Sequence, residues 1–349
     1  RKSRTLPGYK SSNEKIYSIL SKKILVTGGA GYIGSKFCYD AIDNGYEIIV
    51  VDNLSTGKKK LLPPNVIFYK CNISNTNKIN SIFIKHKIKN VVHFAASISV
   101  EESMRNPVKH YINNTIATEK LIKVCVKNKI DKFIFSSTCA VYGNINKKII
   151  SEKLDCYPES HYGKSKLLSE ILLKNYSKKF KFSLGVLRYF NVIGADKKLR
   201  TGCVNNIGQL FKNLAKNIDK NFFHINVFGN NYDTPDGSCI RDYIDINDLS
   251  IYHLELLKKL KKKEIVTLNC GYGKGYSVFK IINQFEKFLK IKLKIKILKK
   301  REGDLDKIIC HTGKLKRYFN LNLRTTITES IKNTLKWEKK WSKLESKRS

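Results

Sequence analysis

Residues 23–34, KILVTGGAGYIG, decide the fold of this chain. The first four residues predict a short buried strand, and a helical pattern follows from about Tyr32 to Asn44. The glycines between them match both G-x-G-x-x-G and G-x-x-G-x-x-G. Glycine suits this place because backbone must approach a pyrophosphate closely at a helix N-terminus, where the helix dipole favours an anion. The stretch therefore predicts a dinucleotide site that includes Gly28, Gly31, Tyr32, Ile33 and Gly34.

An acidic residue lies at the distance that such a site requires. Residues 47–52, EIIVVD, predict a second strand that ends in Asp52, eighteen residues after Gly34. A carboxylate at this position accepts hydrogen bonds from the ribose of an adenosine. Arginine, which would accommodate a 2′-phosphate, does not follow Asp52. We therefore expect NAD rather than NADP as the cofactor.

Strands continue to alternate with helices along the first half of the chain. Apolar runs predict strands at 66–69, 91–94 and 132–135, with helix-like segments between them. Two later runs, 185–189 and 266–269, predict the last strands of the same sheet. This alternation predicts an α/β fold, a Rossmann-type doubly wound parallel sheet with a smaller substrate lobe.

The same pattern divides the chain into three parts. They are a basic polar tail (1–22), an NAD-binding domain (23–190) and a mainly substrate-binding lobe (191–349). Because strand 266–269 comes after the second boundary, we expect the two folded parts to interleave. An amphipathic helix at about 326–344, carrying Trp337 and Trp341, is expected near the end of the fold.

Composition excludes several classes of protein. The 349 residues are 42% hydrophobic and 28% charged, so the chain can bury a sizeable core. No stretch approaches the ~20 consecutive apolar residues of a membrane span. The nine cysteines include no C-x-x-C pair and have no histidine cluster beside them, so we expect reduced thiols, no metal site and a cytoplasmic location. Because residue 1 is Arg, a longer precursor with an organelle-targeting segment stays open.

The formal net charge of +38 raises the question of nucleic-acid binding. Most of the excess is lysine, spread from one end of the chain to the other. Its densest stretch, residues 290–297, alternates Lys with apolar residues, which predicts a strand with its apolar face inward and its lysines in water. We therefore expect nucleic acid to be an improbable partner and small anionic ligands to be better ones.

A tyrosine and a lysine form the predicted catalytic pair. Tyr162 and Lys166 stand four residues apart in YGKSK, on one face of a predicted helix. A phenol with a pKa of ~10 is a poor base at neutral pH. A cation at about 6 Å, with an effective dielectric constant near 20, contributes roughly 2.8 kcal/mol and lowers that pKa by about two units. Thr138 follows the strand at 132–135, at the sheet edge where open α/β folds bind ligands. We therefore predict Tyr162 as a base and Thr138 as a hydrogen-bond partner of the same substrate hydroxyl.

Together these motifs resemble the extended short-chain dehydrogenase/reductases of the NAD-dependent epimerase/dehydratase family, and among them the UDP-glucose 4-epimerases. The resemblance covers nearly everything from Lys23 to about Trp341. It is carried by the segments VTGGAGYIGS, VDNLSTG, VHFAAS, FSSTCAVYG, YGKSK, LRYFN, FGNNYDTPDGSCIRDYI and REGDL. In this family tightly bound NAD takes a hydride from sugar carbon 4, the 4-keto sugar turns within the site, and the hydride returns to the other face. The resemblance implies interconversion of UDP-galactose and UDP-glucose.

The resemblance also implies a role for each matching residue. Lys166 would activate Tyr162 and contact a ribose of the cofactor. The NAD site would also include Asp52, Asn53, Asn72, Ile73, Phe94, Ala95, Ala96, Asn113 and Phe190. Asn191, Asn206 and Arg241 would contact the substrate, where charge-assisted hydrogen bonds suit the pyrophosphate. Arg301 and Asp304 would hold the uridine end, and Phe228 would stack on uracil.

The chain departs from the family pattern at several positions. Asn72 stands where many members have an Asp that contacts adenine, and Ile98 stands where some have a Lys. The loop after Asn191 looks shorter than usual. At Ile308 members vary between Tyr and small residues, and size there is associated with admitting N-acetylated sugars. Ile308 is intermediate, so the acceptance of such sugars stays open.

Three alternatives are weighed against this function. Dehydratases and decarboxylases of the same superfamily place carboxylates just after the Ser/Thr, whereas Cys139-Ala140-Val141 follows Thr138 here. A UDP-sugar 4-epimerase acting on an N-acetylglucosamine or a pentose stays open. A non-catalytic, RNA-associated relative that binds a dinucleotide is supported by the charge alone. Relatives are commonly homodimers, which implies an interface of helices around 111–128 and 164–176.

Overall fold

The computed structural model describes residues 22–144, 149–205, 209–220, 222–301 and 305–346. Within them the largest sheet has seven parallel strands in the order β11-β7-β5-β4-β1-β2-β3. These strands are β1 (Lys23–Thr27), β2 (Glu47–Asp52), β3 (Ile67–Lys70), β4 (Asn90–His93), β5 (Lys132–Thr138), β7 (Ser183–Tyr189) and β11 (Ile265–Cys270). The strand order reverses between β1 and β4, which is the switch point where such sheets bind ligands. The predicted doubly wound sheet is confirmed.

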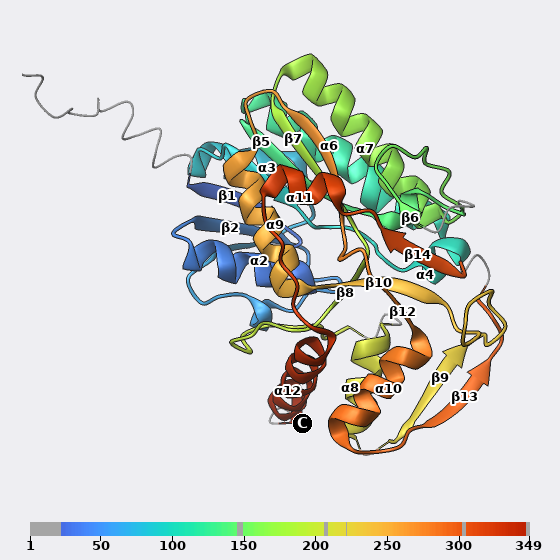
Figure 1. Ribbon diagram of the computed structural model, residues 1–349. Helices are drawn as coiled ribbons and strands as arrows, with labels where there is room; N and C mark the ends of the chain where they lie inside the picture. Colours follow the sequence, from blue (N-terminus) through green and yellow to red (C-terminus); the bar gives the residue numbers. More distant parts are fainter. Residues whose placement is uncertain (1–21, 145–148, 206–208, 221, 302–304, 347–349) are drawn as a thin grey trace, which may run out of the picture.

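Helices cover both faces of this sheet (Figure 1). One face carries α2 (Tyr32–Asp43), α9 (Ile246–Lys259) and α11 (Gly313–Phe319). The other carries α3 (Thr76–His86), α6 (Ala117–Lys127) and α7 (His161–Phe180). Short elements at the sheet edge complete this part, namely η1 (Lys59–Leu61), α4 (Val100–Arg105), α5 (Pro107–His110), the π-helical turn η2 (Tyr111–Ile116) and η3 (Cys139–Val141).

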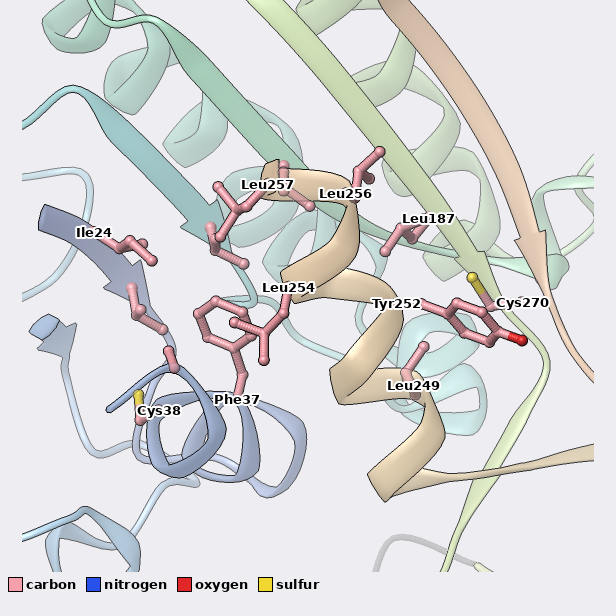
Figure 2. Close-up of a cluster of buried hydrophobic side chains, with 14 of the residues drawn as sticks. Ile24, Phe37, Cys38, Leu187, Leu249, Tyr252, Leu254, Leu256, Leu257 and Cys270 are labelled. Atoms are coloured by element: carbon pink, nitrogen blue, oxygen red, sulfur yellow. The ribbon is translucent and has the colours of Figure 1, made fainter. Parts of the chain in front are cut away.

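The core under α9 shows why the late part of the chain returns to this sheet. Figure 2 shows side chains of α9 between Phe37 of α2 and the strands. Leu256 packs so closely on β7 that a Cβ added at Gly185 would lie 2.5 Å from its Cδ2. Glycine at residue 185 therefore leaves room for Leu256, and a larger residue would force that side chain to shift.

A smaller lobe lies beside the carboxyl edge of the large sheet (Figure 1). Its strands are β6 (Ile149–Ile150), β8 (Asn191–Ile193), β9 (His224–Phe228), β10 (Ile240–Asp245), β12 (Gly275–Ser277), β13 (Lys294–Leu298) and β14 (Lys307–Cys310). Its helices are α8 (Leu210–Asp219), α10 (Val278–Leu289) and α12 (Ile327–Ser346). Strand β10 joins β8, β12 and β14, while β9 and β13 pair with each other in parallel.

Most predicted elements are confirmed, and one is wrong. The late strands β7 and β11 lie in the large sheet, and α12 buries Trp337 and Trp341. The strand expected at 290–297 starts only at Lys294, and its residues Ile295 and Ile297 are each 41% exposed. The alternation did not bury them because β13 belongs to a two-stranded ribbon, so the core covers their partners Ile225 and Val227 but not the outer strand. The division at residue 190 stays a prediction, and of the expected tail the structure describes only Lys22.

Candidate active site

A cavity of about 450 Å³ opens at the carboxyl ends of the central strands, at the switch point of the large sheet. It gathers most of the site residues that the sequence predicts. These are Gly28, Gly31, Tyr32, Ile33, Gly34, Asp52, Asn53, Asn72, Ile73, Phe94, Ala95, Ala96, Asn113, Thr138, Tyr162, Phe190 and Asn191. The residues come from parts of the chain far apart in sequence, and the parallel strands bring them to one edge.

The glycine loop between β1 and α2 forms one wall of this cavity. Gly28 has φ +71°, and a Cβ there would lie 2.5 Å from the backbone N of Ala95. A Cβ at Gly34 would lie 2.3 Å from the Gly28 carbonyl oxygen. Both positions therefore require glycine, since the loop is pressed against the backbone just after β4 on one side and against its own helix on the other.

Helix α2 begins at Tyr32 and points its N-terminus into the cavity. Gly31 is the N-cap residue, and it makes no side-chain capping hydrogen bond. The first turn of α2 contains no acidic residue. An uncapped helix start with its dipole directed at a cavity fits an anionic group such as a pyrophosphate.

Asp52 at the end of β2 forms the next wall. Its carboxylate accepts hydrogen bonds from the backbone N–H of Ala30 at 3.0 Å and of Leu54 at 2.8 Å. These bonds fix the side chain while lone pairs remain for a ligand. Burial raises the pKa of Asp52, and the two backbone hydrogen bonds oppose that rise. The arrangement fits a ribose diol at this end of the cavity.

The next residues extend the cavity beyond Asp52. Asn72 lies in a turn, where its Oδ1 accepts a hydrogen bond from Ser74 N–H at 2.9 Å. Ile73 is buried beside it and supplies an apolar wall. The Asn72 side chain therefore keeps its amide group as a donor at the position where many relatives carry a carboxylate.

Asn113 and Asn114 link the middle of the cavity to α7. Asn113 Nδ2 donates to Ser97 Oγ at 3.0 Å. Asn114 Oδ1 accepts from Ser97 N–H at 2.7 Å, and its Nδ2 donates to Ser165 Oγ at 2.9 Å. Asn114 was not predicted, although it is buried and joins the loop after β4 to the helix that carries Tyr162.

Thr138 and Tyr162 meet at the inner end of the cavity. Thr138 ends β5, and its Oγ1 accepts a hydrogen bond from Ala140 N–H at 3.1 Å. Tyr162 lies in the first turn of α7, whose N-cap Ser160 accepts a hydrogen bond from Gly163 N–H at 3.1 Å. Burial raises the pKa of Tyr162 to about 12, and hydrogen bonding with Thr138 lowers it only in part.

The predicted lowering of the Tyr162 pKa is therefore wrong. The arithmetic placed a full charge on Lys166 and left out burial. Burial lowers the pKa of Lys166 itself to about 7, against the attraction of Glu170, so at neutral pH this lysine carries only part of a charge. Its Nζ lies 4.1 Å from the centre of the Phe135 ring. Lys166 is not among the residues that line the cavity, but it lies one turn below Tyr162 on α7.

Of the predicted substrate residues of the small lobe, Asn191 lines the cavity, whereas Arg241, Phe228 and Arg301 lie outside its lining. Arg241 of β10 donates from Nη1 to the Ile240 carbonyl oxygen at 2.9 Å, and its charge acts on Cys139, next to Thr138. The Arg301 guanidinium carbon lies 3.9 Å from the centre of the Phe228 ring. The ring on which uracil was expected to stack is therefore covered by the arginine expected to hold the uridine. Asn206 and Asp304 lie outside the described residues.

Carboxylates are scarce around Thr138 and Tyr162. Among the described residues that line the cavity, Asp52 is the one acidic side chain, and its backbone bonds place it at the far end. In the described part of the chain, no three His, Cys, Asp or Glu side chains come together as metal ligands would. Nor does any described helix have the length and apolar character to cross a membrane.

Comparison with known proteins agrees with this geometry. The family model described as the NAD dependent epimerase/dehydratase family matches residues 24–271. The chain belongs to this family.

Among its members, the chain is 33% identical to the UDP-glucose 4-epimerase of Azospirillum brasilense, over 91% of this chain and 92% of that one. It is 32% identical to UDP-arabinose 4-epimerase 1 of Arabidopsis thaliana, over 90% of this chain and 79% of that one. A crystal structure of the UDP-glucose-4-epimerase from Stenotrophomonas maltophila, with bound NAD and formylated UDP-arabinopyranose, superposes with a TM-score of 0.87. That protein is 28% identical to this chain, and the match covers 92% of this chain and 99% of the crystallised one.

A second group of residues behind the epimerase-family site was missed by the sequence analysis. Glu170, one turn beyond Lys166 on α7, is fully buried and accepts a hydrogen bond from Ser137 Oγ at 2.5 Å. It also accepts from Arg188 of β7, at 2.9 Å from Nε and 2.7 Å from Nη2. This pair ties α7 to β5 and β7 under the Tyr-Lys pair. Its only signal in the sequence is an Arg inside a buried strand, which requires a carboxylate partner that the sequence does not identify.

Proposed function

We propose that this protein is a UDP-glucose 4-epimerase, which interconverts UDP-galactose and UDP-glucose with a bound NAD. The observation that carries the proposal is that Thr138 and Tyr162 line one cavity, whose described walls beside them hold no carboxylate. Elimination or decarboxylation from a 4-keto sugar needs added acid–base groups beside this pair. With those groups missing from the described lining, returning the hydride is the exit that the site supports.

The residues present fit NAD at the outer part of the cavity. The glycine loop and the uncapped start of α2 suit its pyrophosphate, and Asp52 suits the adenosine ribose. Phe94, Ala95, Ala96, Asn113 and Phe190 would line the remainder, and Lys166, which lies outside the lining, would have to turn toward the cavity to reach a ribose hydroxyl. When bound, NAD supplies an acceptor for the hydride of sugar carbon 4 and gives that hydride back.

Tyr162 performs the proton transfers in the proposed reaction. Its phenolate takes the proton of the sugar 4-hydroxyl as the hydride leaves carbon 4, which forms the 4-keto sugar. The same phenol returns the proton when the hydride comes back to the opposite face, so protons and electrons balance over one turnover. Thr138 lines the cavity together with Tyr162 and orients the sugar oxygen. Because burial raises the pKa of Tyr162, this role requires the protonated form of Lys166, whose positive charge would favour the phenolate.

The small lobe is proposed to bind the UDP part of the substrate. Asn191 lines the cavity, and Arg241 lies on β10 near the active-site turn after Thr138. Phe228 and Arg301 would receive the uridine, which has to displace or share the contact between them. Asn206 and Asp304 remain proposals from the resemblance.

A second question is which UDP-sugar the site prefers. The similarity to a UDP-arabinose 4-epimerase favours a pentose as the alternative substrate. Ile308 stands opposite Arg241 in the β10–β14 pairing, so its size acts beside a proposed substrate contact. A UDP-N-acetylhexosamine therefore stays a further alternative.

We also propose that two copies pair through η2 and α7. These helices are neighbours, since Thr115 donates to the Ser165 carbonyl oxygen at 2.9 Å. Together they expose Ile112, Ile116, Leu168 and Ile171, each between 45% and 49%. Apolar side chains gathered on one face are typical of an interface. Light scattering should give a dimer for the parent protein and a monomer for Ile171→Glu. The control Ile84→Glu, at an exposed position of α3, should stay a dimer. A monomeric parent protein would contradict this proposal.

A cytoplasmic location is proposed on the state of the thiols. All nine cysteines are free in the structure, and six of them are buried. This pattern is typical of a reducing compartment.

The direct test is chromatography of UDP-sugars after incubation with UDP-galactose and no added NAD. Formation of UDP-glucose to equilibrium is expected, because NAD is carried through purification and regenerated in each turnover. Parallel incubations with UDP-arabinose and UDP-N-acetylglucosamine rank the alternatives. If the NAD-loaded protein converted none of the three, the epimerase proposal would be overturned and the binding-protein alternative would gain weight.

A further inference from the structure

Residues 194–205, which follow β8, form a segment that we call the strap. Cys203 and Asn205 of the strap line the cavity together with Tyr32 of α2. At the other end of the strap, Tyr32 Oη donates to the Gly194 carbonyl oxygen at 2.6 Å. The strap therefore borders the helix start at which the pyrophosphate of a dinucleotide is proposed to bind.

The strap is fastened to α2 by a buried hydrogen bond. Ser35 Oγ and Thr201 Oγ1 lie 2.6 Å apart, and both side chains are fully buried. Asp196 N–H donates to the Thr201 carbonyl oxygen at 3.0 Å, which closes the strap on itself. The contact is one turn from the N-terminus of α2, so it holds the strap directly beside the proposed anion site.

Arg200 adds an ionic fastening to the same helix. Its Nε lies 2.7 Å from Asp196 Oδ2, its Nη1 lies 2.8 Å from Asp43 Oδ2, and its Nη2 lies 3.6 Å from Asp40 Oδ1. Lys36 of α2 completes the cluster at 2.9 Å from Asp196. Burial disfavours the charge of Asp196, but the hydrogen bond from Arg200 and the charge of Lys36 outweigh it and lower its pKa to about 2.

The outer side of the strap is fastened to α12. Gly202 packs against the Trp337 ring so closely that an added Cβ would lie 2.5 Å from it. Trp337 Nε1 donates to the Cys203 carbonyl oxygen at 3.2 Å, and Lys340 Nζ donates to that of Leu199 at 2.8 Å. Ala195 belongs to the same apolar cluster as Trp337. The strap is thus held between two helices, one of which forms the wall of the cavity.

We propose that the strap retains NAD between turnovers and that Arg200 is the residue that sets the rate of its release. The inference rests on the proposed function, in which NAD is regenerated and has no need to leave. A dinucleotide bound at the start of α2 would be bordered by Cys203 and Asn205, and in this proposal it leaves only when the strap moves. Movement of the strap away from α2 breaks the contacts of Arg200 with Asp40 and Asp43, together with that of Asp196 with Lys36.

The test measures NAD release directly. Protein loaded with radiolabelled NAD is freed of unbound label by gel filtration, and loss of the label is followed during a chase with excess unlabelled NAD. For Arg200→Ala we expect release at least about tenfold faster than from the parent protein. Its turnover should also become dependent on added NAD after dilution.

A neighbouring lysine provides the matched control. Lys198 lies in the same strap and pairs with Asp43 at 3.0 Å, but its side chain is 67% exposed and makes no contact with Asp196 or Asp40 in the described structure. Lys198→Ala is expected to release NAD at the parent rate. Equal acceleration by Lys198→Ala and Arg200→Ala would reduce the effect to a general loss of positive charge and overturn the role of Arg200.

A second variant covers the case in which Arg200→Ala fails to fold. Thr201→Val keeps the ionic cluster and removes only the hydrogen bond to Ser35, and it is expected to accelerate release by a smaller factor. A folded Arg200→Ala or Thr201→Val that releases NAD at the parent rate would overturn the strap proposal and leave the epimerase proposal standing. A parent protein that takes up no NAD would instead overturn the proposed function.

Discussion

The proposed pyrophosphate site in the cofactor half of the cleft is built of backbone, whereas the proposed uridine site in the substrate half is built of side chains. Gly28, Gly34 and the start of α2 shape the proposed NAD site, and each is fixed by contacts with β4 or with the loop itself. In the small lobe the proposed uridine site consists of Phe228 and Arg301, which lie on each other. A backbone-built site is complete once the sheet has formed, while a side-chain site keeps the conformation that suits its own charges until a ligand competes for it.

The largest expected effect comes from removing the base. Tyr162→Phe should lower turnover of UDP-galactose by about 10³-fold or more, because the proton of the sugar hydroxyl has no acceptor. The NAD content after purification should stay that of the parent protein, since the cofactor half is untouched. Tyr157→Phe is the matched control, because Tyr157 lies just before α7 and is 71% exposed. Retained turnover in Tyr162→Phe would remove this residue from the mechanism.

The next variant breaks the cofactor half through its backbone. Gly28→Ala places a Cβ 2.5 Å from Ala95 N at a residue with φ +71°, so the loop has to move. We expect NAD binding to weaken by about 100-fold or more, measured by titration with NAD. Gly45→Ala has a similar φ of +78° but open space around the added Cβ, so it bears the strain without the collision. If both variants bound NAD equally well, the close approach at Gly28 would have no part in forming the site.

A smaller effect is expected in the substrate half. Arg301→Ala uncovers Phe228 and removes a proposed uridine contact, so KM for the UDP-sugar should rise by about tenfold while kcat stays within about twofold. NAD titration should be unchanged, which separates the two halves. The matched control is Lys300→Ala, whose side chain lies over Tyr232 and pairs with Asp306 instead. A KM unchanged in Arg301→Ala would place the uridine elsewhere.

The smallest expected effect concerns the buried lysine. Burial lowers the pKa of Lys166 to about 7 from a usual value near 10.5, so between these values the unfolded chain binds more protons than the folded one. Stability due to this group therefore rises with pH from about 7 to 10.5. Lys166→Met should accordingly raise the Tm most near pH 6, and by less toward pH 9. Lys164→Met, at an exposed position of α7, should show no such trend in thermal melts; a trend of equal size there would contradict the assignment.

The sequence predicted the cofactor half well because its signals are local. A glycine loop, an acid at the end of a strand and a Tyr-Lys spacing all report on single turns or on the edges of strands, and the parallel sheet brings them together. The strands and α2 were located to within a few residues for the same reason. These contacts follow from the chain path, so no side-chain conformation had to be known.

The remaining features depend on contacts between distant residues. Neither the Glu170–Arg188 pair under α7 nor the strap between α2 and α12 has a local motif. The predicted direction of the Tyr162 pKa shift was wrong because the sequence shows the spacing of Tyr162 and Lys166 but not the burial of the tyrosine. The predicted burial of Ile295 and Ile297 was wrong for a similar reason, because alternation identifies the apolar face of a strand but not whether other residues cover that face.

The interleaving of the two lobes has a consequence for synthesis on the ribosome. Strand β7 ends at Tyr189, but its neighbour β11 ends only at Cys270, after β8, α8, β9 and β10 of the small lobe. At a usual elongation rate this delay lasts roughly 4–16 s. Throughout it, β7 is an unpaired sheet edge, and the face that α9 will cover is bare. The nascent chain therefore passes through an aggregation-prone intermediate. Chaperone binding is expected to coincide with translation of residues 190–270.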